Sequence, residues 1–555
     1  MSSVVLSYKP IPDLEIKLTS GYNRQEVNEF LGTPTTAYDP DIAIYFTSGT
    51  SQFTYNTNYA WSLEPQINYS KKIGKGKLLA TIGSSLQSEN STVISTSVTG
   101  YSSDLLLSSP SAGTTTTTVQ PYSVSPTKFS ALFGRLAYSW ADKYNIDITG
   151  RDDGSSNFGE NKQFHVFGAA GASWIFSEES FIKNNLPFLY FGKLRGSYGS
   201  TGRDNIAPYS YLSTYNSNGL TYGGSSGLIP TRLPNPDLSW ETTKKAELSL
   251  ELQFLKGRID FETNFYRNRT SGFLNANPLS DVTGFQTLNE NLAGVVQNQG
   301  FDVSLATVNI RNTNFTWSTT ILFTRDRNIL ASYPGLQTSP YASVYVIGQP
   351  VNIIHTYRFA GVNPQTGIYQ FYTAAGAITT SPTTNDRTGL VNINPDFYGS
   401  VQNSFRYKQF SLSFMFRYIK QIGTNAFYNL GILPVGFAAN NNYNTLVLNR
   451  WQAPGQVTDI QRYGSSFALI YPQLYATESN HAYGDASYIR LQNLSFAYQL
   501  PSRLASKIGV QSLQVFVQGD NLWTITGYNG IDPENQSAYS LPPLRTMTAG
   551  LRLTL

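Results

Sequence analysis

The last eleven residues, Arg545 to Leu555, constrain the fold of this chain more than any other stretch. They read RTMTAGLRLTL, in which apolar and polar residues alternate to the final position. A period of two is typical of a β-strand with one apolar and one polar face. Chain ends fray unless pairing holds them, and lipid does not tolerate an open strand edge. The pattern predicts the last strand of a closed membrane barrel, with a lipid face formed by Met547, Leu551, Leu553 and Leu555.

The same alternation recurs along the chain. Examples are the stretches 14–18, 61–69, 78–82, 246–254, 315–323, 410–416, 494–500 and 513–517. About eighteen strands of ~8–12 residues are expected, the length that a tilted strand needs to cross a bilayer. Short turns, such as KKIGKGK at 71–77, alternate with long polar loops, placed after Tyr22 and at roughly 87–125. Membrane barrels show this asymmetry, with short periplasmic turns and long extracellular loops.

Composition supports this all-β class and weakens the alternatives. The 555 residues include 37 Tyr, 32 Phe and no Cys, and only 13% are charged, against a usual ~25%. The net charge of +4 comes with no basic block, so no nucleic-acid partner is expected. No apolar run of about 18 residues is present, which excludes transmembrane helices. A soluble sandwich has shorter loops, and a propeller shows a fixed repeat.

Several longer phrases carry a family resemblance. They are GRDDGSSNFG (150–159), KLRGSYGSTG (193–202), LPNPDLSWETT (233–243), GQP (348–350), AGVNPQTG (360–367), NPDFYGS (394–400), RWQAPGQVTDIQR (450–462), ASYIRLQNLSFAYQLP (486–501) and VQGDNLWTITGYNGIDPE (517–534). In this order they resemble the C-terminal barrel of the SusC/RagA-type TonB-dependent transporters in the outer membrane of Gram-negative bacteria. The resemblance covers nearly the whole chain.

The resemblance implies a barrel of about 22 strands, closed by an N-terminal plug and driven through TonB. It also implies a SusD-like surface lipoprotein as a lid, with glycans or peptides as cargo. The signal peptide, N-terminal extension, TonB box, plug and first strands of the family are expected to be missing. Residues 1–555 are therefore interpreted as an incomplete barrel, either a C-terminal fragment or a truncated gene product. Leu555 stands where many such barrels end in Phe, which weakens the assembly signal.

Three short motifs suggest other chemistry but lack its context. GGSSG at 223–227 matches the hydrolase pattern G-x-S-x-G, yet that elbow needs a strand before it and a helix after it. Asp152-Asp153-Gly154 lacks the ligand spacing of a calcium loop and is expected to form a tight turn. His165, His355 and His481 are scattered along the chain, so no metal cluster is expected. We therefore predict no catalytic site, no cofactor and no metal.

Aromatic residues divide into two groups. Those at strand ends, such as Tyr69, Tyr138, Phe416 and Tyr498, are expected to form interfacial girdles. Others lie in loops rich in Asn, Ser and Gly, where rings can stack on sugars, contact a protein lid or simply pack within the loop. The candidate substrate or lid-contact residues are Tyr209, Tyr211, Tyr215, Tyr222, Phe427, Tyr428 and Tyr443.

Charged residues on the polar phase of the strands, such as Arg135, Glu247 and Arg552, are expected to face the lumen. An Arg that faced lipid at mid-depth would cost ~2–4 kcal/mol. The function favoured by these observations is nutrient uptake across the outer membrane without catalysis. The partners implied are a SusD-like lipoprotein, TonB, outer-membrane lipid and a glycan or peptide cargo. Two alternatives stay open: a passive outer-membrane pore, and a soluble or surface β protein that binds glycans.

Overall fold

The structure is a computed structural model that describes residues 2–39, 48–429, 443, 445–537 and 540–554. The side chains of residues 218–222, 426 and 429 lie outside this description. The chain divides into two compact units. Unit 1 comprises Met1–Trp174, Ser197–Lys245 and Thr270–Ala293, and unit 2 comprises Ile175–Gly196, Ala246–Arg269 and Gly294–Leu555. Seventeen of the described strands belong to one large sheet, close to the number expected.

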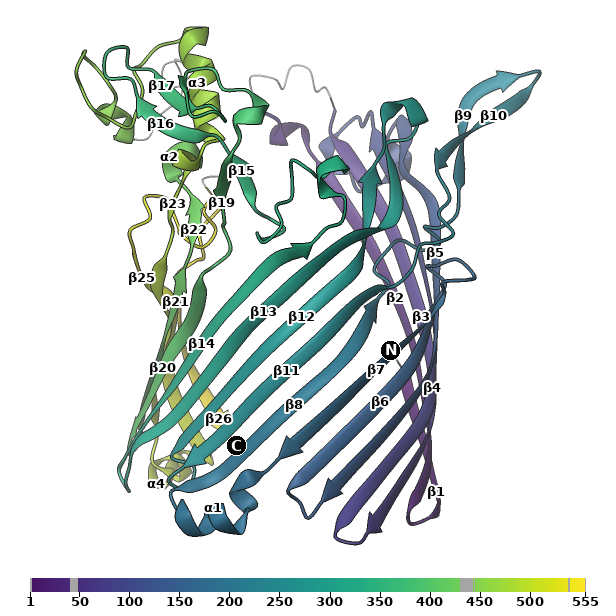
Figure 1. Ribbon diagram of the computed structural model, residues 1–555, viewed down its shortest axis with the longest axis vertical. Coiled ribbons are helices and arrows are strands. Elements are labelled where there is room, and N and C mark those ends of the chain that lie inside the picture. Colours follow the sequence, from purple (N-terminus) through teal and green to yellow (C-terminus); the bar gives the residue numbers. More distant parts are fainter. Residues whose placement is uncertain (1, 40–47, 430–442, 444, 538–539, 555) are drawn as a thin grey trace. The chain divides into compact units, whose positions relative to one another are not determined.

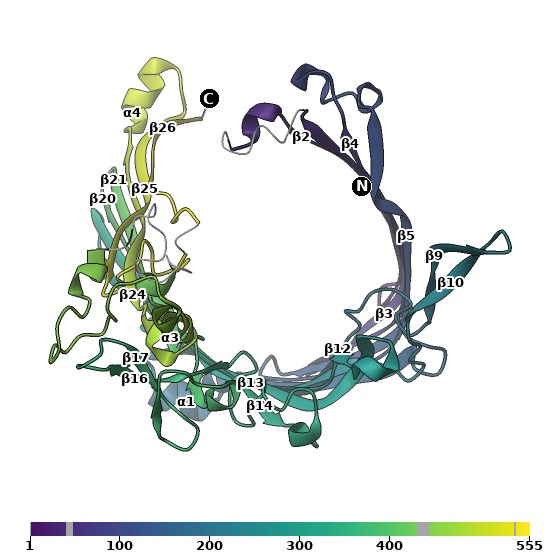
Figure 2. The ribbon, with the colours of Figure 1, turned by 90° about the horizontal axis from the view of Figure 1, so that it is seen from above.

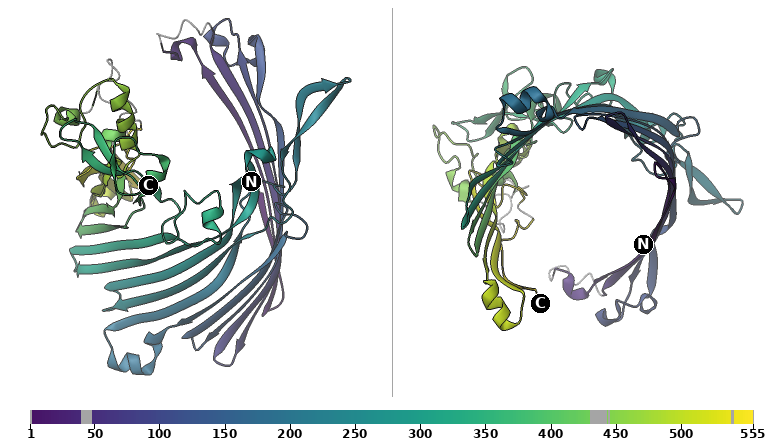
Figure 3. Two further views of the ribbon diagram at one scale, coloured as in Figure 1. Left: turned by 45° about the horizontal axis from the view of Figure 1, so that its top comes forward. Right: turned by 90° about the horizontal axis from the view of Figure 1, so that it is seen from below.

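In unit 1, consecutive strands pair antiparallel from β1 to β7, and the left view of Figure 3 shows them side by side in purple to blue. A separate hairpin, β9 with β10, also belongs to unit 1. The strands are β1 (Ser2–Ile11), β2 (Leu14–Thr33), β3 (Thr50–Ile73), β4 (Gly76–Thr99), β5 (Thr115–Trp140), β6 (Tyr144–Ser155), β7 (Phe164–Trp174), β9 (Thr214–Tyr222) and β10 (Ser225–Arg232).

In unit 2, a second antiparallel series pairs β13, β14, β20, β21, β24, β25 and β26 in that order. Its remaining strands are β14 (Phe315–Ser332), β20 (Phe397–Tyr407), β21 (Phe410–Lys420), β24 (Tyr488–Gln499), β25 (Ser512–Thr526) and β26 (Thr546–Thr554). Four strands have residues in both units: β8 (Leu189–Arg203), β11 (Glu241–Phe254), β12 (Ile259–Pro278) and β13 (Thr287–Arg311).

Short elements fill the loops of unit 2, where β16, β17 and α3 lie together in Figures 1 and 2. The short strands are β15 (Ile354–Thr356), β16 (Arg358–Val362), β17 (Tyr369–Tyr372), β18 (Ile378–Thr379), β19 (Gly389–Val391), β22 (Ile422–Thr424) and β23 (Tyr483–Asp485). The α-helices are α1 (Ser180–Asn185), α2 (Ala426–Asn429), α3 (Phe467–Thr477) and α4 (Ser502–Ala505). No helix of the described residues has the length and apolar character needed to cross a membrane.

The strand register of unit 1 gathers apolar side chains on one face. Residues directly opposite each other in an antiparallel pair share a face, and Ile16, Ile67 and Ile82 are opposite one another on β2, β3 and β4. The same face continues through paired residues of the later strands. We call it the apolar face of unit 1; it includes Leu63, Ile67, Tyr69, Leu78, Ala80, Ile82, Leu86, Leu132, Leu136, Tyr138, Ile146 and Ile148.

This apolar face is not covered by protein. Ile82, Leu132 and Val166 are 55%, 59% and 71% exposed. A continuous apolar surface of this size on a soluble monomer is unusual and marks contact with a membrane or a partner. The alternation of apolar and polar residues predicted from the sequence is therefore confirmed, and its apolar phase is exposed.

The polar phase forms ion pairs between neighbouring strands. Arg135 on β5 pairs with Asp147 on β6, and Arg195 on β8 lies 2.8 Å from Glu247 on β11. Lys193 and Glu251 make a further pair on β8 and β11 at 3.0 Å. These side chains are partly exposed, so each pair contributes about 0–1 kcal/mol. The charges follow the polar face, as the sequence pattern predicts.

Several strands are much longer than expected. β3 and β4 each have 24 residues and β5 has 26. The predicted loop at 87–125 is wrong over most of its length, because β4 continues to Thr99 and β5 begins at Thr115. The loop placed after Tyr22 is likewise shorter, since β2 continues to Thr33. These extensions are rich in Ser, Thr and Asn on both faces, so the hydrogen-bonded ladder continues where the alternation of hydrophobicity has ended.

The short turns are confirmed. Gly74 and Lys75 separate β3 from β4, and Gly74 has φ of 60°. Ala141 to Lys143 connect β5 to β6; Ala141 and Asp142 have φ of 52° and 56°, and Lys143 N donates to the Trp140 carbonyl at 3.0 Å, which closes the turn. In Figure 1 the turns of unit 1 lie at its lower end. Asp152-Asp153-Gly154 is a correction: it lies inside β6 and forms no turn, and Arg151 pairs with Asp153.

Buried apolar residues gather in small clusters where loops meet strand ends. Those of unit 1 are two clusters that each combine strand residues with loop residues. One consists of Phe53, Val98, Tyr101 and Leu107, and the other of Phe158, Phe167, Leu238 and Trp240. The buried apolar residues of the described chain are thus divided among small clusters where loops join strands. None of these clusters covers the apolar face of unit 1.

Candidate functional site

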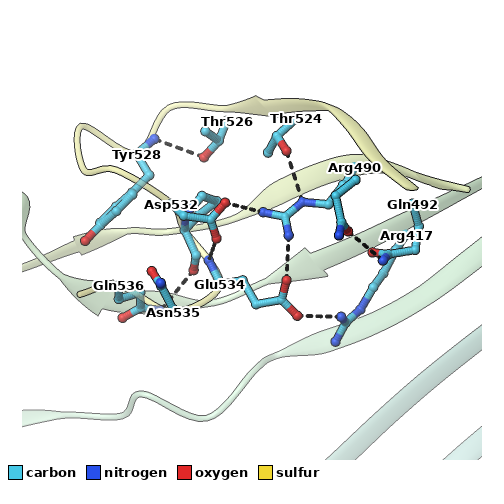
Figure 4. A network of polar contacts seen from close by, with 12 residues as sticks. Arg417, Arg490, Gln492, Thr524, Thr526, Tyr528, Asp532, Glu534, Asn535 and Gln536 are labelled. Atoms are coloured by element: carbon cyan, nitrogen blue, oxygen red, sulfur yellow. Dashed lines mark hydrogen bonds and ion pairs between the residues drawn. The ribbon is translucent and has the colours of Figure 1, made fainter. Parts of the chain in front are cut away.

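A buried arginine holds the loop that precedes β26 (Figure 4). Arg490 on β24 is 1% exposed at its side chain. Its Nη2 donates to Asp532 Oδ2 and its Nη1 to Glu534 Oε2, both at 2.6 Å, and its Nε donates to Thr524 Oγ1 at 3.0 Å. The guanidinium also lies 5.0 Å from the ring centre of Tyr488. Charge-assisted bonds of this length are the strong ones in proteins.

The register explains why this arginine needs two carboxylates. Arg490 lies directly opposite Arg417 on β21, and like charges opposite each other destabilise a sheet. Glu534 lies between them, because its Oε1 accepts from Arg417 Nη1 at 2.7 Å while its Oε2 accepts from Arg490. We call Arg417, Arg490, Asp532 and Glu534 the C-terminal latch. The two carboxylates offset the repulsion between the two arginines, and because both carboxylates belong to the loop, they also hold the loop on the strands.

Neighbouring contacts hold the same loop by its backbone. Gln421 Nε2 donates to the Pro533 carbonyl at 2.9 Å, and the Tyr528 hydroxyl donates to the Thr424 carbonyl at 2.8 Å. Within the loop, Glu534 N donates to Asp532 Oδ1 at 2.9 Å, which orients that carboxylate. The loop is therefore fixed to strands of unit 2 at several points, and its position is set by them.

Above the strands of unit 2, aromatic rings form a buried cluster. We define the loop cluster as Tyr357, Tyr369, Phe371, Tyr428, Ala476 and Ala482. The hydroxyls of Tyr369 and Tyr428 lie 3.5 Å apart. Burial raises the pKa of Tyr369 to about 12 and raises the pKa of Tyr428 well above its usual value. Both phenols are neutral at physiological pH, and the cluster gives the loops a core of their own.

A histidine completes this cluster. His481 stacks on Phe359 with ring centres 4.1 Å apart and an interplanar angle of 9°. Burial lowers the pKa of His481, with a smaller opposing effect from Asp459. A neutral imidazole packed between rings is a structural residue. It is not placed to serve as a metal ligand, and the described residues contain no group of three or more potential ligands.

A polar pocket of about 310 Å³ lies beside the last third of β14, whose residues 325–329 form part of its lining. A reciprocal pair of amide hydrogen bonds between Asn352 and Asn394, at 2.8 and 2.9 Å, fixes one side of it. No ion pair joins its cations and anions among the described residues. The pocket therefore presents both charges and amides to a polar ligand; its polar lining includes Arg325, Asp326, Arg327, Asn328, Gln349, Asn392, Asn394 and Asp396.

Comparison with known proteins decides the family. Residues 3–522 match the family described as TonB dependent receptor-like, beta-barrel. The chain belongs to this family. It is 29% identical to TonB-dependent receptor P3 of Formosa agariphila, over 99% of this chain and 57% of that protein. It is 24% identical to TonB-dependent receptor SusC of Bacteroides thetaiotaomicron, over 98% of this chain and 54% of that protein.

Solved structures give the same fold. The RagAB peptide transporter structure matches the receptor barrel with a TM-score of 0.85 and 24% identity, over 99% of this chain and 61% of that chain. The ferric citrate transporter FecA matches with a TM-score of 0.51 and 10% identity. The predicted resemblance to SusC/RagA-type receptors and the all-β barrel class are confirmed. The chain spans little more than half the length of the curated relatives that it matches.

The structure places the candidate loop residues of the receptor barrel in different surroundings. Tyr428 is buried in the loop cluster, and Phe427 packs against it from a half-buried position. Tyr209 and Tyr211 contact each other with ring centres 6.3 Å apart, and Tyr211 also packs on the Phe158 cluster. Tyr215 on β9 is 58% exposed. Packing within the loops covers most of the surface of Tyr209, Tyr211, Phe427 and Tyr428. A role of these residues in binding stays a prediction.

Two further candidates are less informative. Tyr443 is half-buried and already has interactions within the chain. Tyr222 closes β9, and its side chain lies outside the described residues. The GGSSG stretch beside it forms the turn of the β9–β10 hairpin, with φ of 58° at Gly223 and 83° at Gly224. A strand follows this turn, so the hydrolase elbow is excluded at that position, as the sequence context predicts.

The apolar residues of the final strand lie on one face, as its sequence predicts. Leu551 and Leu553 on β26 lie opposite Val515 and Leu513 on β25. Met547, Leu551 and Leu553 are 81%, 65% and 55% exposed. They form one apolar face together with the apolar residues of β25, whereas Leu555 lies outside the described residues. Contact of this face with lipid stays a prediction.

Sequence reasoning missed the C-terminal latch. Both halves lie in phrases that carried the family resemblance, Arg490 in ASYIRLQNLSFAYQLP and Asp532 and Glu534 in GYNGIDPE. The available signal was a charged residue within an otherwise alternating strand, together with two acidic residues in a nearby loop. Spacing alone does not pair residues that are 42 positions apart.

Proposed function

We propose that the chain is the barrel part of a TonB-dependent importer in the outer membrane of a Gram-negative bacterium. In this proposal a plug carried by another part of the protein couples the barrel to TonB, and a SusD-like lipoprotein covers the loops. The observation that carries the proposal is the exposed apolar face of unit 1, held in register across β2 to β6. The family match over residues 3–522 supports it.

The cargo proposed is a peptide or a glycan. The relatives named above include a SusC receptor and a peptide transporter. The polar pocket beside β14 supports a polar cargo, because it offers amide groups together with guanidinium and carboxylate groups that form no ion pair with one another among the described residues. Such groups bind peptide backbones and sugar hydroxyls alike. None of this chemistry calls for catalysis, and the family is one of receptors.

The test is uptake by the bacterium that encodes the chain. Deletion of the gene should abolish accumulation of either fluorescent oligopeptides or fluorescent oligosaccharides, and collapse of the proton-motive force should have the same effect in the undeleted strain. Uptake that is lost on deletion but insensitive to the proton-motive force would indicate a passive pore. Recovery of the expressed chain as a monodisperse protein without detergent would contradict a membrane barrel and favour a soluble glycan-binding protein.

A further inference from the structure

A groove of about 650 Å³ opens on the apolar face of unit 1 and has no role in the function proposed above. Its volume falls within the range of ligand pockets, ~300–1,000 Å³. Its walls come from β3, β4, β5, β6 and the start of β7. Its lining residues include Trp61, Leu86, Ser88, Lys128, Ser130, Gly154 and Phe164.

The register shows which face the groove occupies. Leu86 lies opposite Leu63 and Ser130, and Ser130 lies opposite Gly154. Gly154 in turn lies opposite Phe164. Paired residues share a face, so the groove is part of the apolar face. Two residues further along each strand, on the same face, Trp61 lies opposite Ser88 and Ser88 lies opposite Lys128. The groove thus spans the level at which this face changes from apolar to polar.

Aromatic side chains line part of the groove and make it suitable for a hydrocarbon chain. Trp61 and Phe164 are 45% and 60% exposed and form aromatic walls. The Phe164 ring lies over Gly154, where an added Cβ would approach the ring to 2.5 Å. Tyr22, opposite Trp61 and 50% exposed, extends the aromatic wall. Aromatic residues with one apolar and one wet side gather at the membrane–water boundary, which places the groove at headgroup depth.

Lys128 lies at the polar end of the groove. Lys128 is exposed, and its side chain has no ion pair among the described residues. Its backbone is fixed, because Lys128 N donates to Ser156 Oγ and Ser156 N donates to the Lys128 carbonyl, both at 2.9 Å. Asp152 lies on the same face on the apolar side of Gly154. An anionic group is therefore favoured at Lys128 and disfavoured nearer the centre of the sheet.

We infer that this groove binds a phosphate-bearing lipid of the surrounding membrane, with an acyl chain between Trp61 and Phe164 and the phosphate at Lys128. The inference rests on the proposed membrane location of the barrel. Attraction to one Lys at a membrane surface corresponds to about a fivefold preference for the anionic over the zwitterionic lipid. The long stem of Lys128 allows its ammonium to reach the headgroup while its methylenes stay on the apolar side.

Quenching by brominated lipids tests the site in the full chain. The protein is inserted into vesicles of phosphatidylcholine in which a minor fraction is brominated in the acyl chain, either as phosphatidylglycerol or as phosphatidylcholine. The difference between wild type and Trp61→Phe isolates the fluorescence of Trp61 from that of the other six tryptophans. We expect Trp61 to be quenched at about fivefold lower mole fraction by the brominated anionic lipid than by the zwitterionic one.

Charge variants separate a specific site from general contact with lipid. Lys128→Gln should remove the preference, Lys128→Arg should keep it, and Asp152→Asn should increase it. Lys17→Gln is the matched control, because Lys17 lies opposite Gln66 on the polar face. Equal quenching by both lipids in wild type, or an unchanged preference in Lys128→Gln, would overturn the lipid site and leave the barrel intact. Absence of quenching by either lipid would instead contradict the membrane location itself.

Discussion

The two series of strands treat the region beyond their apolar part in opposite ways. In unit 1, β3, β4 and β5 continue as a polar hydrogen-bonded sheet to lengths of 24, 24 and 26 residues. In unit 2, β20, β21 and β24 end after 11, 11 and 12 residues, and the chain then folds into loops around the loop cluster and the C-terminal latch. Both arrangements satisfy the backbone N–H and C=O groups beyond the apolar layer, one through a regular ladder and the other through hydrogen bonds within packed loops.

This difference teaches where each region is vulnerable. A ladder distributes its stability over many similar hydrogen bonds, so one side chain matters little. A packed loop concentrates stability in a few buried groups, so the loss of one is severe.

Arg490→Met should destabilise the loop end of unit 2 by ~3–5 kcal/mol, because it leaves the buried Asp532 carboxylate without its cation. The measurement is urea unfolding of the protein refolded in lipid vesicles, together with the rate at which a protease cleaves the segment 527–537. Arg417→Met is the matched control, since Arg417 is 40% exposed and its loss should cost at most ~1 kcal/mol. Equal effects of the two substitutions would refute the special role of the buried arginine.

Leu553→Arg should hinder assembly of the barrel, because a charge on the predicted lipid face is unfavourable, by up to ~2–4 kcal/mol at mid-depth and by less towards the strand end where Leu553 lies. Thr554→Arg should be mild, since Thr554 lies on the other face of β26, where it contacts Ser512. The yield of folded protein in the outer-membrane fraction measures both. Similar yields would show that the two faces of the final strand have been assigned the wrong way round.

The loop cluster should weaken in alkali. The folded pKa of Tyr369, about 12, lies above the ordinary value near 10, so the neutral phenol is the form that the folded loops favour. Its contribution is complete below pH ~10 and is lost as the pH rises towards ~12, at most ~2–3 kcal/mol. Protease cleavage of the loops at stepped pH measures this loss. Tyr369→Phe should reduce the dependence, and an identical pH profile for the variant would contradict the assignment.

The smallest effect is expected in the β9–β10 hairpin. Gly224→Ala should cost about 1 kcal/mol, because φ of 83° there is unfavourable for a residue with a Cβ. Space is not the cause, since an added Cβ meets nothing within 4 Å. Ser225→Ala is the neighbouring control and should be neutral. Local hydrogen exchange of the hairpin amides would show the difference, and equal exchange in both variants would argue against strain at the turn.

The sequence was most informative where one physical cause dominated. Contact with an apolar environment on one side makes hydrophobicity alternate with period two, and this alone placed Ile67, Ile82 and Leu553 on their faces. The polar extensions could not be predicted in this way, because the run of threonines at 115–118 has no alternation of apolar and polar residues, although it pairs with β4. The latch and the loop cluster depend on contacts between distant positions, such as Tyr369 with Tyr428, which no local pattern encodes.

The register of unit 1 also limits how such a chain can change over generations. Ile16, Ile67 and Ile82 stay opposite one another only while the strands between their turns keep their parity. Loss of a single residue inside β3 would transfer every following side chain of that strand to the opposite face, whereas loss or duplication of a whole hairpin would leave the phase untouched. Receptor barrels should therefore vary by entire hairpins and by loop length, and rarely by single residues within a strand.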